Sequence, residues 1–479
     1  MSHRLRLIAL ALFTVGPVAA AQERSFDVVV VRGRVVDPES GLDAVRSIGI
    51  RRGRIAAISA GPLPGQTVID ARGLVVAPGF IDLHAHGQDD ENYRVFALDG
   101  VTTALELELG TANVDPWYSA RVGKALINHG VSVGHIKTRM AVMGDPGIFL
   151  PTGVGGRDPA TTEQIAEMKR RIRAELAKGA LGVGFGLQYT PGASKHEVLE
   201  MFRAAADFKA PAFVHTRSWG TTDPGGSVES YMEVIAASAI TGAPLHIVQL
   251  NSTSLAQTPL TLELVGEARE HGMDVTAEAY PYSAGMTEIS SPLLDRFDDA
   301  PDSMYARLQL VSTGERLTRE TFHRNRKPGV MIILHLNTPE MEAMAIRSPL
   351  TAIASDGLLE KGKGHPRTAG TSARVLGYYV RETKQLTLID AVRKLALLPA
   401  HRLERLAPAF RAKGRIKVGA DADLAIFDPA TVIDKATYSA PNVASEGFRY
   451  VLVNGVPVVS GGQVRDGVFP GKPARAPTH

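Results

Sequence analysis

Short apolar segments alternate with helical patterns through the middle of the 479-residue chain, from about residue 79 to residue 411. This alternation predicts a parallel α/β structure, either a closed barrel or a doubly wound sheet. No phosphate-binding glycine loop follows a strand, which favours the barrel. The apolar segments include residues 101–109, 212–215, 245–250, 274–279 and 352–355, and the helical patterns include residues 161–178, 195–209 and 388–405.

The sequence on both sides of this region is rich in β-forming residues. Residues 27–31, 35–37, 46–50 and 54–58 read as short antiparallel strands near the N-terminus, and residues 422–427 and 450–455 repeat the pattern near the C-terminus. We therefore expect a β-unit made of residues 22–78 and 412–469, which flanks a barrel of residues 79–411. The Pro- and Lys-containing tail, residues 470–479, is expected to be disordered.

The N-terminus has the pattern of a secretory signal peptide. Basic residues 3–6 precede an apolar stretch from Leu7 to Phe13, and the segment ends in Val18-Ala19-Ala20-Ala21. A buried helix or a membrane anchor is the alternative, but the stretch is shorter than the roughly 20 residues that span a bilayer. We predict a signal peptide of residues 1–21, a periplasmic or secreted protein, and no membrane span after its removal.

Charge and cysteine content exclude several classes of function. The 53 Lys and Arg nearly balance 50 Asp and Glu, so a net charge of +3 gives no electrostatic reason to expect nucleic acid as a partner. The chain has no cysteine, which excludes disulfides, thiolate zinc sites, iron–sulfur clusters and a cysteine nucleophile. Any metal must therefore bind to His, Asp, Glu or other oxygen donors.

The strongest candidate for chemistry is the segment Pro78-Gly-Phe-Ile-Asp-Leu-His84-Ala-His86. Side chains at positions i and i+2 of a strand point to the same side, so both imidazoles can reach one cation at the strand end. The alternative is two ordinary surface histidines. The apolar strand that leads into the pair favours a metal site.

Three further strand ends carry polar residues. Glu106 and Glu108 share one face of an apolar strand, where burying two carboxylates without a cation is costly. His215 ends another apolar strand, and Asp356 ends a third. An aspartate beside a metal-bound water can act as a general base and then protonate the leaving nitrogen. The alternatives are a half-solvated strand face, a structural histidine and a turn aspartate.

Together these residues resemble the amidohydrolase superfamily, and within it the D-aminoacylase (N-acyl-D-amino-acid deacylase) family. The resemblance covers roughly residues 26–465. The matching segments are the His84-x-His86 segment, Gly-Val-Thr-Thr at 100–103, Gly-Leu-Gln-Tyr-Thr-Pro-Gly at 186–192, His-Thr-Arg at 215–217, Tyr-Pro-Tyr at 280–282, Ser-Asp-Gly at 355–357, His-Pro-Arg-Thr-Ala-Gly at 365–370 and Gly-Ala-Asp-Ala-Asp-Leu at 419–424.

The resemblance implies an (α/β)8 TIM-like barrel, a flanking β-sandwich built from both termini, a small insertion at residues 286–348, and one or two zinc ions. It places His84 and His86 in one metal subsite and His215 in the other, usually tighter, subsite. Asp356 is then the catalytic base and acid. The implied contacts to a substrate carboxylate are Tyr189, Tyr280 or Tyr282, and Arg367.

Two positions depart from the family pattern. The family places a cysteine ligand near Leu109, and this chain offers Glu106 or Glu108 instead, of which we favour Glu108 because it lies closer to the strand end. Gln249 and Asn251 stand where the family has a His ligand and a Lys. Gln is a weak neutral oxygen ligand for zinc. His246 lies three residues before Gln249 and could bind the metal only if the strand register shifts.

These residues predict a metal-dependent hydrolase of C–N amide bonds that acts on a small molecule, most simply an N-acyl-(D-)amino acid or a peptide-like compound. The alternatives are another barrel hydrolase, acting on dipeptides, cyclic amides or lactones, and a ligand-binding homologue that has lost catalysis through Gln249. The number of metals and assembly into homo-oligomers stay open.

Overall fold

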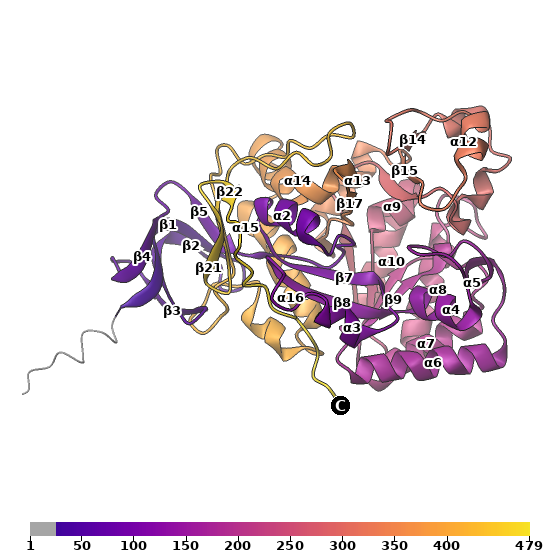
Figure 1. Ribbon diagram of the computed structural model, residues 1–479, viewed down its shortest axis with the longest axis horizontal. Coiled ribbons are helices and arrows are strands. Elements are labelled where there is room, and N and C mark those ends of the chain that lie inside the picture. The colour runs from indigo at the N-terminus through magenta and orange to yellow at the C-terminus, as the bar shows by residue number, and fades with distance from the viewer. Residues whose placement is uncertain (1–24) are drawn as a thin grey trace, which may run out of the picture.

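The computed structural model describes residues 25–479, so the predicted signal peptide lies outside the described residues. A barrel forms the larger part of the molecule, and a curved β-sheet made from both ends of the chain lies beside it (Figure 1). The chain passes from the sheet to the barrel between Pro78 and Phe80. The structure thus has the expected fold class.

Eight parallel strands form the barrel sheet, in the order β16-β12-β11-β10-β9-β8-β7-β6. The two outer strands of this order meet through the backbone, because His86 N and Gly87 N both donate to Gly357 O at 3.0 Å. The strands are β6 (Phe80–Asp82), β7 (Val101–Thr111), β8 (Asn128–Gly134), β9 (Val183–Gly186), β10 (Ala212–His215), β11 (Leu245–Ile247), β12 (Val275–Ala279) and β16 (Thr351–Ile353).

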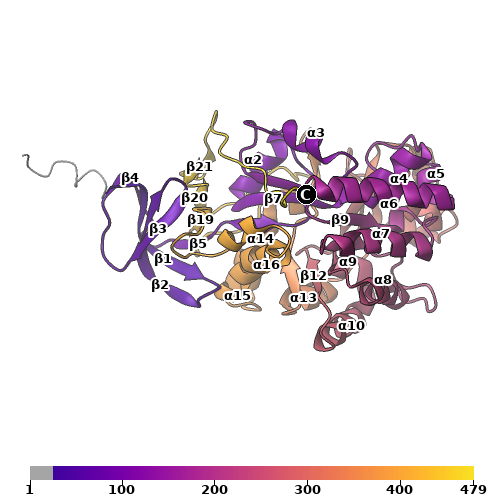
Figure 2. The same ribbon diagram turned by 90° about the horizontal axis from the view of Figure 1, so that it is seen from below.

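Helices cover the outside of the barrel, which explains why its strands are buried on both faces (Figure 2). The predicted helical segments correspond to α6, α7 and the run from α15 to α16. The helices are α2 (Asp90–Leu98), α3 (Val114–Ser119), α4 (His135–Met143), α5 (Val154–Arg157), α6 (Thr162–Ala177), α7 (Lys195–Asp207), α8 (Ser227–Thr241), α9 (Leu250–Ser254), α10 (Thr258–Glu270), α13 (Pro339–Arg347), α14 (Arg367–Arg374), α15 (Leu388–Val392) and α16 (Leu398–Leu403).

The flanking β-unit is a nine-stranded, mostly antiparallel sheet that both termini build. Strand β5 from the N-terminal part pairs with β19 from the C-terminal part, which joins the two halves. The sheet has its own apolar core, made largely of valine and isoleucine. Its strands are β1 (Phe26–Asp37), β2 (Leu42–Arg51), β3 (Arg54–Ser59), β4 (Gly65–Asp70), β5 (Val75–Pro78), β19 (Leu424–Phe427), β20 (Phe448–Val453), β21 (Val456–Ser460) and β22 (Gln463–Val464).

A small subdomain is inserted between β12 and β16, in the slot that the resemblance implies. Its three-stranded sheet consists of β13 (Gly285–Glu288), β14 (Leu308–Leu310) and β15 (Met331–Leu334), with the short helices α11 (Asp302–Tyr305) and α12 (Arg319–Asn325). Its apolar core includes Leu109 and Tyr189 from the barrel, so it packs over the end of the barrel where these residues lie. Helix α13, which follows it, already belongs to the barrel wall.

The C-terminal tail is ordered along the barrel, and the expectation of a disordered tail is wrong. It lacks regular structure beyond an isolated bridge but is held by backbone hydrogen bonds. Ala474 N donates to His129 O at 2.7 Å, and Ala476 N donates to Gly179 O at 3.1 Å. Both alanines are buried. Sequence composition could not reveal these partners, because they lie some three hundred positions away.

Within residues 25–479, no helix combines the length and the apolar character that crossing a membrane requires.

Candidate metal centre

The candidate metal ligands lie where neighbouring barrel strands end. His84 and His86 follow β6, Glu108 lies near the end of β7, and Asp356 follows β16. These strands are neighbours around the barrel, so their ends point to one place. The carboxyl ends of barrel strands are also where barrel enzymes have their active sites.

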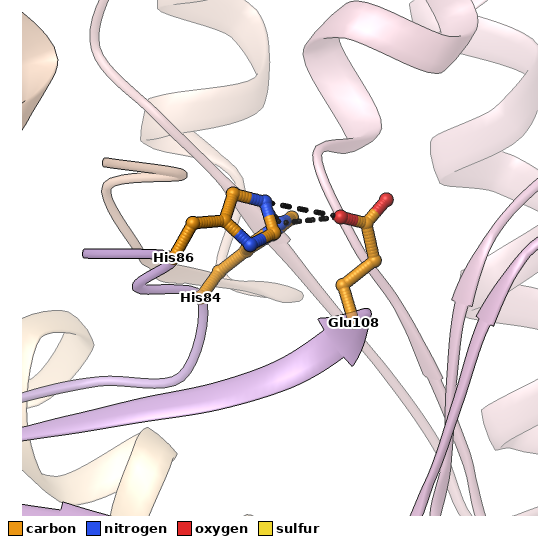
Figure 3. A group of neighbouring side chains, drawn as sticks. All are labelled: His84, His86 and Glu108. Atoms are coloured by element: carbon orange, nitrogen blue, oxygen red, sulfur yellow. Dashed lines mark hydrogen bonds and ion pairs between the residues drawn. The ribbon is translucent and has the colours of Figure 1, made fainter. Parts of the chain in front are cut away.

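Four side-chain atoms converge at this place: His84 Nε2, His86 Nε2, Glu108 Oε2 and Asp356 Oδ1. His84 Nε2 lies 3.2 Å from His86 Nε2 and 3.0 Å from Glu108 Oε2 (Figure 3). His86 Nε2 lies 3.2 Å from Glu108 Oε2 and 3.2 Å from Asp356 Oδ1. His84 Nε2 also lies 3.5 Å from Asp356 Oδ1. We call these four residues the cage.

Five of the six separations in the cage are close to those of ligands around a tetrahedral zinc ion. Bonds of about 2.0–2.2 Å to nitrogen and oxygen place the corners of a tetrahedron about 3.3–3.6 Å apart. The five separations above deviate from this range by a few tenths of an ångström at most. Within residues 25–479, His84, His86 and Glu108 are the group of histidines and acids that meets the spacing of a metal site. Imidazole and carboxylate are also ligands that zinc accepts.

Two further carboxylates orient the cage histidines. Glu278 Oε1 accepts a hydrogen bond from His84 Nδ1 at 2.7 Å, and Glu106 Oε2 accepts one from His86 Nδ1 at 2.8 Å. Each bond fixes the tautomer in which Nε2 is free to face the cage. Glu106 is held in turn by the backbone N–H groups of Leu109 and Gly110. Glu108 therefore belongs to the cage, and Glu106 lies one shell outside it.

Sequence reasoning missed Glu278, although a signal was present. Glu278 interrupts the apolar strand β12 two positions before the Tyr-Pro-Tyr segment. The argument that singled out Glu106 and Glu108, a carboxylate in a strand buried on both faces, applies equally to this residue. Its burial confirms that it needs a partner there.

The cage carries an excess of negative charge. Burial alone would lower the pKa of His84, but the charges of Asp356 and then Glu108 raise it to about 10. Burial would raise the pKa of Glu108, but the charge of His84 and the surrounding histidine hydrogen bonds hold it well below its usual range. A divalent cation relieves such an excess in a buried site.

A second polar group lies on the other side of Glu108. Glu108 Oε1 accepts from His215 Nδ1 at 2.7 Å, and Gln249 Nε2 lies 3.4 Å from the same oxygen. His215 Nε2 lies 2.7 Å from Gln188 Oε1. Sequence reasoning did not name Gln188, although it stands inside the Gly-Leu-Gln-Tyr segment that carried the resemblance.

His246 does not reach the cage. Its strand, β11, pairs in regular register with both neighbours, so the register shift that would bring it inward does not occur. His246 Nδ1 bonds Thr276 Oγ1 at 2.7 Å, and Nε2 bonds Glu278 Oε2 at 3.0 Å. Its place as a candidate ligand is therefore corrected: it supports Glu278, which supports His84.

Arg367 is bound to Asp356 by two contacts. Arg367 Nε donates to the backbone oxygen of Asp356 at 2.8 Å, and its terminal nitrogen Nη2 pairs with Asp356 Oδ2 at 2.7 Å. The guanidinium is buried and stacks on the ring of Tyr280 at 4.5 Å. Its other terminal nitrogen, Nη1, has no partner in the described part of the chain. Nη1 is thus the terminal nitrogen that Arg367 has left for a substrate.

The three candidate tyrosines divide into two groups. Tyr189 packs edge-on against His215, and Tyr280 stacks on Arg367, so both adjoin the metal centre. Burial, followed by the charges of Glu108 and Asp356, raises the pKa of Tyr189 well above its usual value, so it stays a phenol. Tyr282 points elsewhere, because its hydroxyl donates to Asp434 at 3.2 Å. The structure does not bring Tyr282 to the centre.

Two cavities adjoin the metal centre. One is lined by His86, Glu108, Asp356 and Arg367. The other, which is the larger of the two, is lined by the polar groups around His215 and by apolar side chains of the inserted subdomain. Tyr189, Met286 and Thr287 line both cavities. The two cavities therefore lie next to each other beside the metal centre.

The sequence also matches a family model described as the amidohydrolase family, over residues 67–348 and 263–459. The chain belongs to this family. The N-acyl-D-glutamate deacylase of Alcaligenes xylosoxydans xylosoxydans is 32% identical over 480 residues, which cover 91% of this chain and 94% of that protein. The D-aminoacylase of the same organism is 28% identical over 490 residues, which cover 91% of this chain and 95% of that protein.

Solved structures agree. The crystal structure of N-acyl-D-glutamate deacylase from Bordetella bronchiseptica, complexed with zinc and a phosphonate mimic of the tetrahedral intermediate, matches with a TM-score of 0.81. It is 27% identical, and the match covers 94% of this chain and 100% of that one. The family and fold that the sequence motifs predicted are confirmed.

Proposed function

We propose that this chain is a metal-dependent amidohydrolase that removes the acyl group from N-acyl-D-amino acids. The observation that carries the proposal is the cage, in which two imidazoles and two carboxylates converge at zinc-compatible distances beside a buried, partly unpaired arginine. The deacylases to which the chain is similar support the choice of bond and of substrate hand.

The cage residues would hold a zinc ion, and the ion would polarise the scissile carbonyl and acidify a water molecule. Asp356, which lies beside both cage histidines, would accept a proton from that water and return it to the departing nitrogen. Arg367 holds the Asp356 carboxylate in position and offers Nη1 to the substrate carboxylate. Burial raises the pKa of Tyr280 to about 12, so this residue stays protonated. The Arg367 guanidinium stacks on its ring.

The lining of the larger cavity indicates which chemical groups the substrate has at positions remote from the scissile bond. The lining includes Leu255, Leu293, Leu334 and Leu336 and, in the described part of the chain, contains no lysine or arginine. Burying a second carboxylate there without a cation would be costly. We therefore infer a preference for uncharged, apolar side chains or acyl groups over acidic ones.

Turnover of a substrate panel tests the proposal. Zinc-loaded protein should hydrolyse N-acetyl- and N-formyl-D-amino acids, with N-acetyl-D-leucine or D-methionine turned over faster than N-acetyl-D-glutamate. The Asp356→Asn variant is the matched control and should lose about 10²–10⁴-fold in kcat. Activity on hydantoins, lactones or dipeptides alone would point to another barrel hydrolase. No turnover of any panel member would favour the ligand-binding alternative, which rests on Gln249.

We further propose that the protein is exported after removal of residues 1–21. The basic start, short apolar stretch and Ala-rich end of this segment support the proposal. Expression of the full chain in a bacterial host, followed by cell fractionation and mass measurement, tests it. The expected result is a periplasmic protein that begins at Gln22. A cytoplasmic protein with an intact N-terminus would contradict export.

A further inference from the structure

The Glu108 carboxylate divides the centre into two halves that differ in their ligands. Oε2 faces His84 and His86, and Oε1 faces His215 and Gln249. A carboxylate placed in this way could bridge two metal ions. Whether it does depends on what each half offers.

The cage half offers the larger number of imidazole and carboxylate ligands. Besides Glu108 Oε2 it contains two imidazole nitrogens and the Asp356 carboxylate, and outer carboxylates fix both imidazoles. The opposite half offers one histidine and the neutral amides of Gln188 and Gln249. Amides bind zinc poorly.

The distances between polar atoms also differ between the two halves. The cage separations of 3.0–3.5 Å are those of ligands around a common ion. His215 Nδ1 and Glu108 Oε1 lie 2.7 Å apart, which is the length of a direct charge-assisted hydrogen bond. The other nitrogen of His215 is also engaged, at 2.7 Å from Gln188 Oε1. Both nitrogens of this histidine are thus occupied by protein oxygens.

We infer that this chain uses a single metal ion, bound in the cage by His84, His86, Glu108 and Asp356, and that His215 positions the side-chain amides of Gln188 and Gln249 as a metal-free subsite that hydrogen-bonds the amide group of the substrate. The inference rests on the proposed function. It assigns the ion to the cage half, whereas the family resemblance favoured the half that contains His215.

The backbone at Gln249 supports a built polar subsite. Gln249 has φ +48°, in the left-handed region that glutamine rarely adopts, and this conformation costs of the order of 1 kcal/mol. Its side chain reaches His215 Nδ1 at 3.2 Å and lines the larger cavity. Local strain that places a polar group at a cavity wall is typical of binding sites. An amide group pairs well with the amide of an N-acyl substrate.

Metal counting on the intact protein tests the inference without using activity. Protein freed of metal and titrated with Co²⁺ should bind one equivalent. X-ray absorption at the zinc edge of the singly loaded protein should show two imidazoles per zinc, as the cage requires. Occupation of the His215 half would give one imidazole per zinc, and that result would overturn the inference.

Three matched variants locate the ion. His84→Asn should bind less than about 0.2 equivalent of Co²⁺. His215→Asn should still bind one equivalent, with an affinity loss within the about 10–100-fold range of outer-shell changes, and should raise KM for the N-acyl substrate. Gln249→His adds an imidazole beside His215 and Glu108 Oε1 and should bind a second equivalent. Circular dichroism verifies that each variant is folded.

The outcomes separate this inference from the proposed function. Three results would overturn the inference, even if the enzyme deacylates its substrate panel. The first is two equivalents of Co²⁺ in the unaltered protein, and the second is loss of Co²⁺ in His215→Asn with retention in His84→Asn. The third is the absence of a second equivalent in Gln249→His. One equivalent in the cage, with no turnover of any panel compound, would support the metal assignment and reject the deacylase function.

Discussion

Arg367 binds Asp356 through both its backbone oxygen and its carboxylate, at 2.8 Å and 2.7 Å. The two contacts fix the position of a residue whose backbone is in the left-handed conformation, with φ +53°. Arg367 begins helix α14, so the outer layer of the barrel holds the candidate base at the end of β16. The arginine is therefore a positioning residue as well as a candidate contact for the substrate.

This double contact predicts the effect of Arg367→Met. Because the variant releases Asp356 from its place, kcat should fall about 10²-fold or more, the typical effect of a displacement of about 1 Å at a reacting group. KM should rise as well, since the unpaired Nη1 is lost. Steady-state kinetics separates the two parameters, and the exposed Arg324→Met serves as control. An increase in KM alone would show that Arg367 only binds substrate.

Glu278→Gln should weaken zinc binding. The substitution keeps the shape of the side chain but removes the charge that fixes the tautomer of His84 through the 2.7 Å bond. Outer-shell changes of this kind cost about 10–100-fold in metal affinity. Competition with a chelator measures the change, and Glu270→Gln, on the exposed face of α10, is the control. Equal affinities for both variants would refute the role of Glu278.

The sequence allowed the barrel, the flanking β-unit and most of the cage to be predicted, because these features have local signals. A strand buried on both faces reads as an apolar run, and a His, Glu or Asp within it stands out. The roles of Glu106 and Glu108 could be ranked by distance from the strand end, and the structure places Glu108 in the cage and Glu106 outside it.

Other features depend on contacts between distant segments and left no local signal. The sequence could not show that two nitrogens of Arg367 bind Asp356, or that the hydroxyl of Tyr282 donates to Asp434. His246 lies outside the cage because strand β11 pairs in regular register with β10 and β12, and this pairing leaves no signal in the local sequence. The ordered tail likewise depends on partners in β8 and after α6.

Metal removal should make stability depend on pH through His84. Burial opposes its charge, but the carboxylates raise its pKa to about 10 in the metal-free protein, above the value of about 6.5 in an unfolded chain. The stabilisation is therefore complete below about pH 6.5 and is lost as the pH rises toward about 10. Zinc replaces the proton, so the stabilisation by zinc should grow over this interval.

Urea unfolding of metal-free protein at pH 6, 8 and 10, with and without zinc, measures this dependence. His84→Asn removes the titrating group, so the free energy of unfolding of the metal-free variant should lose this dependence on pH. A zinc effect that is independent of pH would contradict the raised pKa.

Asn251 should stabilise the turn that carries Tyr280. Its side chain accepts from Tyr280 N at 3.3 Å and donates to Tyr280 O at 3.1 Å, and it is fully buried. Asn251→Ala leaves these backbone groups without partners and should cost about 1–3 kcal/mol of unfolding free energy. It should also lower kcat/KM, because Tyr280 supports Arg367. Urea unfolding and kinetics check both effects, with Asn325→Ala as control. An unchanged free energy of unfolding would show that the turn does not depend on the Asn251 side chain for its stability.

The ordered tail should contribute to the stability of the barrel. Deletion of residues 473–479 removes the bonds of Ala474 and Ala476 to the backbone and the 2.8 Å bond from Tyr118 to Ala474 O. At about 1 kcal/mol for each hydrogen bond, plus lost burial, the unfolding temperature should fall by several degrees. Calorimetry compares the deletion with a chain whose last seven residues are replaced by Gly and Ser. That replacement keeps the backbone donors and acceptors but loses the buried alanine methyl groups, so it should fall between the deletion and the unaltered protein. A deletion that unfolds at the same temperature as the full chain would show that the tail only rests on the barrel surface.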